Sequence, residues 1–197
     1  MTHDTAPRPR PARQRILAAA DELFYSRGVL STGIDAVTDH ADVARKSLYN
    51  NFASKDDLVH AWLEQRHRDW RGYYDARVAA AQGEGSVDGA GLVLAVFDAY
   101  LDHAMAAGEG FRGCGLLNTA AGYPPDSAVR QLVRRQKQEV EDLLALGSPT
   151  HADMLSHLLE GAVTRAGLEG SPDRLHRARE QAAVILGART VPEGGQG

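Results

Sequence analysis

The chain has very little cysteine, and it also lacks a secretion signal and a long apolar run. One cysteine in 197 residues cannot form an internal disulfide, which is typical of a protein in a reducing compartment. Residues 1–15 lack the apolar centre of a secretion signal, and no apolar run approaches the roughly 18 residues of a membrane span. We therefore expect a cytoplasmic protein that has no membrane partner.

Patterns that mark enzymes, metal sites and cofactor sites are also missing. The eight histidines and the cysteine show no zinc spacing, and neither H-E-x-x-H nor G-x-S-x-G occurs. The sequence GEGFRG at residues 108–113 matches a dinucleotide loop, but a helical pattern precedes it where a strand is needed. We expect no catalytic residue, no metal and no cofactor. Cys114 is interpreted as a small buried side chain, with a redox or electrophile sensor as the alternative.

Charge is unevenly distributed along the chain. The whole protein carries a net charge of -4, and 43% of its residues are hydrophobic, as in a globular protein. Residues 1–55 carry +2 and the remainder carries -6. A modest basic excess therefore lies at the N-terminal end, where it can attract a polyanion while the rest stays acidic.

The periodicity of apolar residues predicts an all-α protein with nine helices. Helical patterns cover residues 12–27, 33–41, 44–51, 55–81, 87–107, 115–122, 149–166 and 172–189, and a further one opens at 126 and continues to at least 144. Ser148-Pro149 and Ser171-Pro172 are interpreted as starts of the last two helices. We expect a tail at 1–12, a small domain at 13–58, a larger helical domain at 59–190 and a second tail at 191–197.

The stretch from Ser31 to Lys55 predicts two short helices joined by a tight turn, followed by a third helix. Thr32 and Asp35 are interpreted as a capping box at the first of these, and Ser54 and Asp57 as a second box. Asp42 stands where the chain must turn sharply, and Asp tolerates left-handed backbone better than most residues. Leu48 and Phe52 then face inward, so the opposite side of helix 44–51 is polar and cationic. Such a helix suits the major groove of DNA.

This segment resembles the DNA-binding domain of TetR-type transcriptional regulators, from about Arg13 to Leu63. The sequence at residues 48–55, LYNNFASK, is close to the family pattern L-Y-x-H-F-x-S-K. It departs from the family at three positions: Asp42 replaces the usual Gly, Ala44 replaces a Ser or Thr cap, and Asn51 replaces His. The resemblance implies a one-component DNA-binding regulator, usually a repressor, that binds a palindromic operator as a homodimer.

Roles for individual residues follow from their chemistry and from this resemblance. Arg45 and Lys46 can both donate to guanine O6 and N7, so they are the candidates for base contacts. The candidates for phosphate contacts are Thr32, Tyr49, Asn50 and Lys55. Ser47 and Asn51 complete the expected DNA-binding set. The alternative is a helical small-molecule-binding or adaptor module that lacks specific DNA binding.

Two further sites are expected in the larger domain. Broad apolar stripes predict that the last two helices pair in a homodimer, through Leu155, Leu159, Ala162, Val163, Ala178, Ala182 and Ile185. Large rings with polar tips predict a pocket for a small, mainly apolar effector, lined by Trp62, Phe97, Tyr100, His103, Cys114, Asn118 and Tyr123. Binding of the effector is expected to release DNA.

Overall fold

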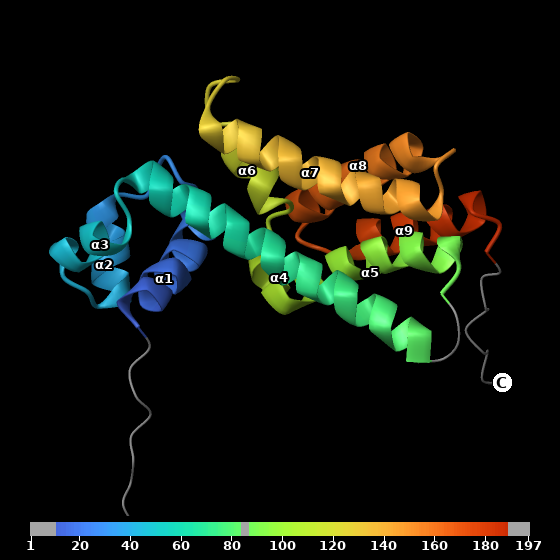
Figure 1. Ribbon diagram of the computed structural model, residues 1–197, viewed down its shortest axis with the longest axis horizontal. Helices are drawn as coiled ribbons and strands as arrows, with labels where there is room; N and C mark the ends of the chain where they lie inside the picture. Colours follow the sequence, from blue (N-terminus) through green and yellow to red (C-terminus); the bar gives the residue numbers. More distant parts are fainter. Residues whose placement is uncertain (1–10, 84–86, 189–197) are drawn as a thin grey trace, which may run out of the picture. The chain divides into compact units, whose positions relative to one another are not determined.

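The structure is a computed structural model that describes residues 11–83 and 87–188 (Figure 1). These residues form nine α-helices and one 3-10 turn, without a strand, which confirms the predicted all-α fold. They divide into two compact units between Glu64 and Gln65, inside helix α4 (Lys55–Gly83), the helix that also contains the boundary predicted after residue 58. The predicted tails fall outside the described residues, except that Pro11 is described and Ala12 already begins α1.

The smaller unit contains α1 (Ala12–Arg27), α2 (Ile34–Ala41), α3 (Arg45–Asn51) and the first part of α4. Gly28 ends α1 with a positive φ of 86°. Asp42 ends α2 in the left-handed conformation, with φ of 50°, as the sequence predicted. Its backbone N–H bonds to the carbonyls of Thr38 and Asp39, which closes the turn before α3. The α2–α3 pair is therefore a helix-turn-helix.

Packing against α1 fixes the side of α3 that faces inward. Ile16 of α1, Leu48 of α3 and Phe52 after it are almost fully buried, at 0%, 0% and 2% exposure. Trp62 closes the same core, where its ring meets Phe24 edge-on at 5.4 Å. With Leu48 and Phe52 inside, the remaining α3 side chains have to face outward.

The predicted capping box at α2 is wrong. Gly33 is the N-cap, and no side chain makes a capping hydrogen bond at the start of α2. The hydroxyl of Thr32 instead donates to the carbonyl of Gly28 at 2.8 Å, and Thr32 is only 2% exposed. The hydroxyl thus satisfies a carbonyl at the end of α1, in the loop between two helices.

The predicted cap of α4 is confirmed. The Ser54 hydroxyl accepts a hydrogen bond from the Asp57 backbone N–H at 3.0 Å. The Asp57 carboxylate accepts from the backbone N–H of Ala53, also at 3.0 Å, so it reaches one residue further back than a standard box. This pair holds Lys55 at the first turn of α4.

The larger unit contains the rest of α4, α5 (Gly89–Ala107), α6 (Gly115–Ala120), α7 (Ala128–Gly147), α8 (Ala152–Glu169) and α9 (Asp173–Ile185). The chain between α5 and α6 holds the 3-10 turn, Gly108–Gly110, so the glycine-rich match there follows a helix and not a strand. Helix α5 packs against α7 and α9, and α8 packs against α7 and α9. Figure 1 shows these helices as a bundle.

Helix α5 lies at the centre of this bundle. It is long and apolar enough to cross a membrane by length and composition, with Val93, Val96 and Phe97 fully buried. Here those side chains belong to the core of the larger unit. Asp98, on the same helix, pairs with Arg179 of α9 at 2.5 Å, which is the behaviour of a core helix with a polar edge.

The ends of α8 and α9 differ from the predicted ones. Ser148 still closes α7, because its backbone N–H donates to Leu144 O at 2.8 Å, so α8 begins only at Ala152. Helix α9 ends at Ile185 rather than near residue 189. Gly187 has a φ of 66°, and the next residue's N–H bonds back to Ala183 O, which is a helix-ending motif.

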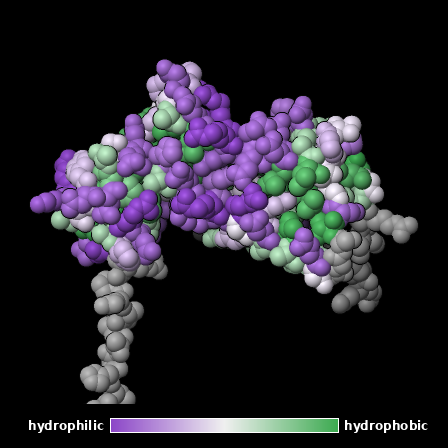
Figure 2. Space-filling view, in the orientation of Figure 1, coloured by the Kyte–Doolittle hydropathy of each residue, from purple (hydrophilic) through white to green (hydrophobic). Residues whose placement is uncertain are grey.

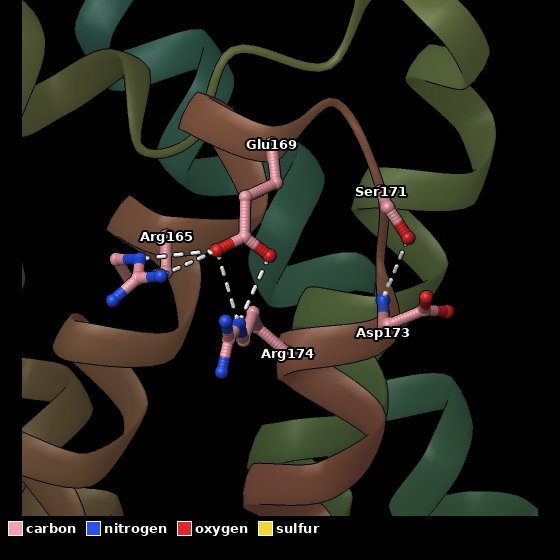
Figure 3. A network of polar contacts seen from close by, with 5 residues as sticks. All are labelled: Arg165, Glu169, Ser171, Asp173 and Arg174. Atoms are coloured by element: carbon pink, nitrogen blue, oxygen red, sulfur yellow. Dashed lines mark hydrogen bonds and ion pairs between the residues drawn. The ribbon is translucent and has the colours of Figure 1, made fainter.

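A polar clamp fixes the corner between α8 and α9 (Figure 3). Glu169, the last residue of α8, accepts from Arg165 at 2.7 Å and from Arg174 of α9 at 2.9 Å. The Ser171 hydroxyl accepts from the Asp173 backbone N–H at 3.2 Å. Hydrogen bonds from Arg174 and Arg165 lower the pKa of Glu169 to about 2, so this corner stays ion-paired at neutral pH.

Candidate DNA-binding surface and effector cavity

The outward side of α3 carries the side chains that the sequence assigned to DNA. Arg45, Lys46 and Asn50 are exposed, and Tyr49 is 45% exposed. Arg45 pairs with Asp35 of α2 at 2.8 Å, and its guanidinium lies 5.8 Å from the Tyr49 ring centroid. Both side chains of this ion pair are exposed to solvent, so the pair adds little stability. A phosphate or a base edge can therefore replace Asp35 as the partner of Arg45.

The other predicted DNA-binding residues have different surroundings. Asn51 is exposed, but its amide donates to the Ser47 carbonyl at 2.8 Å and so closes the last turn of α3. Ser47 is half-buried, and so is Lys55. Thr32 is buried and bonded within the unit, so its hydroxyl is poorly placed to reach a phosphate. Lys46, Tyr49 and Asn50 are therefore the best-presented side chains on this helix.

A cavity lies within the larger unit, with about 450 Å³ of empty space when its open mouth is included. The enclosed part is far smaller, about 30 Å³, so a bound molecule would have to extend into the mouth or displace side chains of the wall. The wall comes from α4, α5, α7, α8 and the segment around α6. Its residues are Arg66, His67, Trp70, Tyr100, His103, Phe111, Gly113, Cys114, Gly115, Leu116, Gln136, Lys137, Val140 and Val163.

The cavity brings together only part of the predicted pocket. Tyr100, His103 and Cys114 are on its wall, and the other four residues are not. Trp62 belongs to the core of the smaller unit, where its indole N–H donates to Asp21 at 2.7 Å. Phe97 is fully buried in the larger core, and the Asn118 amide donates to the Arg112 carbonyl. Tyr123 follows α6 and is half-buried. Aromatic type alone did not separate core rings from cavity rings.

Lys137 of α7 is a further wall residue, although a lysine side chain is seldom buried. Its side chain is only 16% exposed and donates to Glu160 at 2.5 Å and to the Tyr100 hydroxyl at 2.9 Å. The signal was present in the spacing, because residues 133, 137 and 140 share one side of a helix. Burial raises the pKa of Tyr100, despite the nearby ammonium, so the phenol keeps its proton.

Two histidines on the wall have defined partners. The Nε2 atom of His103 lies 2.8 Å from the Arg66 guanidinium, which has donors only. Nε2 must therefore accept, and the ring proton of neutral His103 is on Nδ1. His67 bonds to Glu139 at 2.7 Å, and Glu139 also pairs with Arg71. Partial burial raises the pKa of Glu139, but the hydrogen bonds and charges of His67 and Arg71 outweigh this effect, so the pKa is lowered overall.

The predicted dimer residues mostly face the protein's own core. Leu155, Leu159 and Ala182 are fully buried, while Ala162, Val163 and Ala178 are at most 8% exposed; Ile185 is half-buried. The outer side of α8 and α9 carries a set that shares only Ile185 with the prediction. We call it the α8–α9 face: Met154, Leu158, Glu180, Gln181, Val184 and Ile185. They line a shallow groove, and Val184 is 71% exposed. Figure 2 shows hydrophobic side chains grouped on part of the larger unit's visible surface.

No group of His, Cys, Asp and Glu within residues 11–83 and 87–188 is arranged to hold a metal ion. Cys114 is half-buried on the cavity wall, beside Lys137. The described part of the chain therefore offers three surfaces for a partner or ligand, namely the outer side of α3, the cavity and the α8–α9 face.

Comparison with known proteins identifies the fold and the family. The family model described as "Bacterial regulatory proteins, tetR family" matches residues 16–62, which include the whole helix-turn-helix. The crystal structure of SCO4454, a TetR-family transcriptional regulator from Streptomyces coelicolor, is 33% identical and superposes with a TM-score of 0.74. The match covers 89% of this chain and 95% of that one. This chain belongs to the TetR family of transcriptional regulators.

Other TetR-family proteins support the same assignment. The regulator TtgR from Pseudomonas putida is 32% identical over 102 residues. This region is 50% of the chain but only 47% of TtgR, so the chain matches about half the length of this curated relative. The multidrug-binding protein EbrR, complexed with malachite green, is 26% identical with a TM-score of 0.62, covering 90% and 98% of the two chains. The relatives are regulators, so the chain is a DNA-binding transcriptional regulator and not an enzyme.

Proposed function

We propose that this protein is a cytoplasmic, ligand-responsive repressor that binds a palindromic operator as a homodimer and is released by a small molecule. The observation that carries the proposal is the outer side of α3. Leu48 and Phe52 anchor the helix in the core, and Lys46, Tyr49 and Asn50 are presented outward. An ammonium, a phenol and an amide on one exposed side suit base edges and phosphates in a major groove.

Homodimerisation through the α8–α9 face would give the DNA-binding surface its two-fold symmetry. Two copies of α3, about 34–36 Å apart, would read half-sites on successive turns of one side of the duplex. The exposed apolar side chains of this face support the pairing, since Met154 and Val184 are 47% and 71% exposed. The clamp at Glu169 joins α8 to α9 at the corner between them.

Effector binding in the cavity would act on DNA through α4. Three cavity residues, Arg66, His67 and Trp70, lie on α4, and so does Lys55 at its first turn. A ligand that displaces α4 would therefore disturb the DNA-binding unit through a continuous helix. The complex of EbrR with malachite green supports a ligand role for this fold. The coupling needed for a switch is typically 1–3 kcal/mol, with the DNA-free form binding ligand more tightly.

A gel-shift assay with fragments from upstream of the encoding gene and its neighbours tests the proposed function. We expect one fragment to be retarded specifically, and binding to weaken steeply as salt rises from about 50 to 200 mM, because phosphate contacts release counterions. Footprinting of that fragment is expected to protect an inverted repeat. Weak binding that ignores sequence would instead favour a helical ligand-binding or adaptor module.

The dimer proposal predicts a large effect of Val184→Asp. A carboxylate placed in the centre of an apolar interface loses its water without gaining a partner, so dimerisation should weaken by about a hundredfold or more. Sedimentation velocity at micromolar concentration measures the change. The matched control is Leu146→Asp on α7, which is 69% exposed and outside the α8–α9 face, and it should stay dimeric. A dimeric Val184→Asp variant would move the interface elsewhere.

A further inference from the structure

The polar groups on the cavity wall share one property, which is that nearly all of them donate hydrogen bonds. Arg66 and Lys137 are cations, and none of the described wall residues is Asp or Glu. His103 accepts from Arg66 through Nε2, so its remaining ring nitrogen is a donor. Gln136 adds an amide that can donate or accept. The wall therefore complements a negative or accepting group and opposes a positive one.

Lys137 has donor capacity beyond the bonds that hold it. An ammonium group has three N–H donors, and two are used by Glu160 and the Tyr100 hydroxyl. The third donor remains on a side chain that lies on the cavity wall. Because the Tyr100 hydroxyl accepts from Lys137 and keeps its own proton, it can donate as well. These two groups form a preassembled pair of donors.

Trp70 supplies an independent observation. It is only 5% exposed, and its buried indole nitrogen has no hydrogen-bond partner within the described chain. An unpaired buried N–H is unfavourable, and an accepting ligand atom within reach would remove this cost. The ring itself is held by stacking on His67 and by contact with Tyr100, with centroids 5.6 and 5.4 Å apart. The cavity thus combines apolar ring surface with a buried indole N–H that has no acceptor within the described chain.

We propose that the effector of this protein is a compact apolar molecule carrying a carboxylate, bound with its charge at Lys137 and Tyr100. This inference rests on the proposed ligand response and narrows its chemistry. The apolar part would lie against Phe111, Val140 and Val163, which are buried around the same space. A ligand cation would be desolvated beside Lys137 and Arg66, and the carboxylate next to Lys137, Glu160, is already paired with it.

The single cysteine makes occupancy measurable without knowing the natural effector. Cys114 is the only thiol in the chain and lies on the cavity wall, so a bound ligand should slow its alkylation by iodoacetamide. The probes are 2-naphthoate, 2-naphthamide and 2-naphthylmethylammonium, which share one ring system and differ in charge. Intact mass after timed alkylation gives the protection at each probe concentration.

We expect naphthoate to protect Cys114 at concentrations about tenfold or more below those of the amide, because hydrogen bonds to charged groups are stronger. The ammonium probe should not protect over the same range. Equal or better protection by the ammonium probe would overturn the inference, and so would the absence of protection by all three. This comparison uses the wild-type chain and needs no variant to fold.

Variants of the wall residues test where the carboxylate of the ligand binds. Lys137→Met/Glu160→Gln removes both charges of the pair, so it leaves no buried ion behind, and it should reduce naphthoate protection by about tenfold or more. Trp70→Phe keeps the ring, loses the N–H and should weaken protection less. Arg135→Met removes an exposed cation from the same helix and should change nothing. An unchanged naphthoate profile in the double variant would exclude Lys137 as the binding group.

The same preparations separate this inference from the proposed function. Naphthoate protection without any change in operator binding would support the ligand class and reject the coupling to DNA. Specific operator binding without protection by naphthoate would support the proposed DNA-binding function and reject the carboxylate ligand class.

Discussion

Replacing Gly167 by alanine is expected to lower the free energy of unfolding of the larger unit by about 2–4 kcal/mol. A Cβ atom at this position of α8 would lie 2.2 Å from Gly113 N and 2.4 Å from Arg112 C. Both are backbone atoms, so no side-chain rotation can relieve the contact. Gly113 itself has a φ of 79°, which leaves the loop few alternative paths.

This expectation can be measured by urea unfolding in a Trp62→Phe background. The chain has two tryptophans, one in each unit, so Trp70 then reports on the larger unit alone. Gly72→Ala is the matched control, since an added Cβ at this α4 position meets no atom within 4 Å. It should stabilise the unit by about 0.5–1 kcal/mol through higher helix propensity. Equal unfolding midpoints for the two variants would show that α8 does not approach the loop so closely.

The second large effect is expected from Lys46→Ala on the outer side of α3. If Lys46 contacts a guanine edge, its loss should reduce the preference for the operator over a mismatched site by about 1–3 kcal/mol. Binding to unrelated DNA should change far less. Arg45→Ala is expected to act similarly at another base pair, although it also breaks the exposed pair with Asp35.

Lys55→Ala provides the contrast within the same unit. A phosphate contact carries no sequence information, so this variant should weaken binding to all DNA sequences about equally and flatten the salt slope by about one. Tyr49→Phe should also be blind to sequence. Competition gel shifts at several salt concentrations measure both quantities, and Arg135→Ala, far along the chain on an exposed part of α7, serves as the charge control. Uniform losses for Lys46 and Lys55 would reject Lys46 as a base reader.

Local signals were enough to predict the DNA-binding unit. Gly28 ends α1 and Asp42 adopts the left-handed turn because their backbones tolerate positive φ, and Ser54 caps α4 through its hydroxyl. Leu48 and Phe52 are buried because a helix of this spacing has only one apolar side. In such a short segment, residues close together in the sequence determine the apolar side of each helix and its outward polar side. The family pattern then assigned their use.

Tertiary packing decided what the sequence left open. Thr32 is a good helix cap by type, but the end of α1 brings the Gly28 carbonyl to its hydroxyl. Lys137 looks like a solvent-facing cation, but α5 and α8 bring Tyr100 and Glu160 to it. Both outcomes depend on groups that are distant in sequence, and hydrogen bonds to such groups follow from packing.

The last two helices show the same division between sequence and structure. Their apolar stripes predicted burial correctly, yet Leu155, Leu159 and Ala182 are covered by the protein's own bundle. The narrower strip with Met154 and Val184 stays exposed. The periodicity of apolar residues predicts which sides of a helix are buried, but it does not predict whether the same chain or a second copy covers each side. The sequence by itself therefore determined the helices and the DNA-binding unit, while only the tertiary structure decided which residues line the cavity and which remain outside.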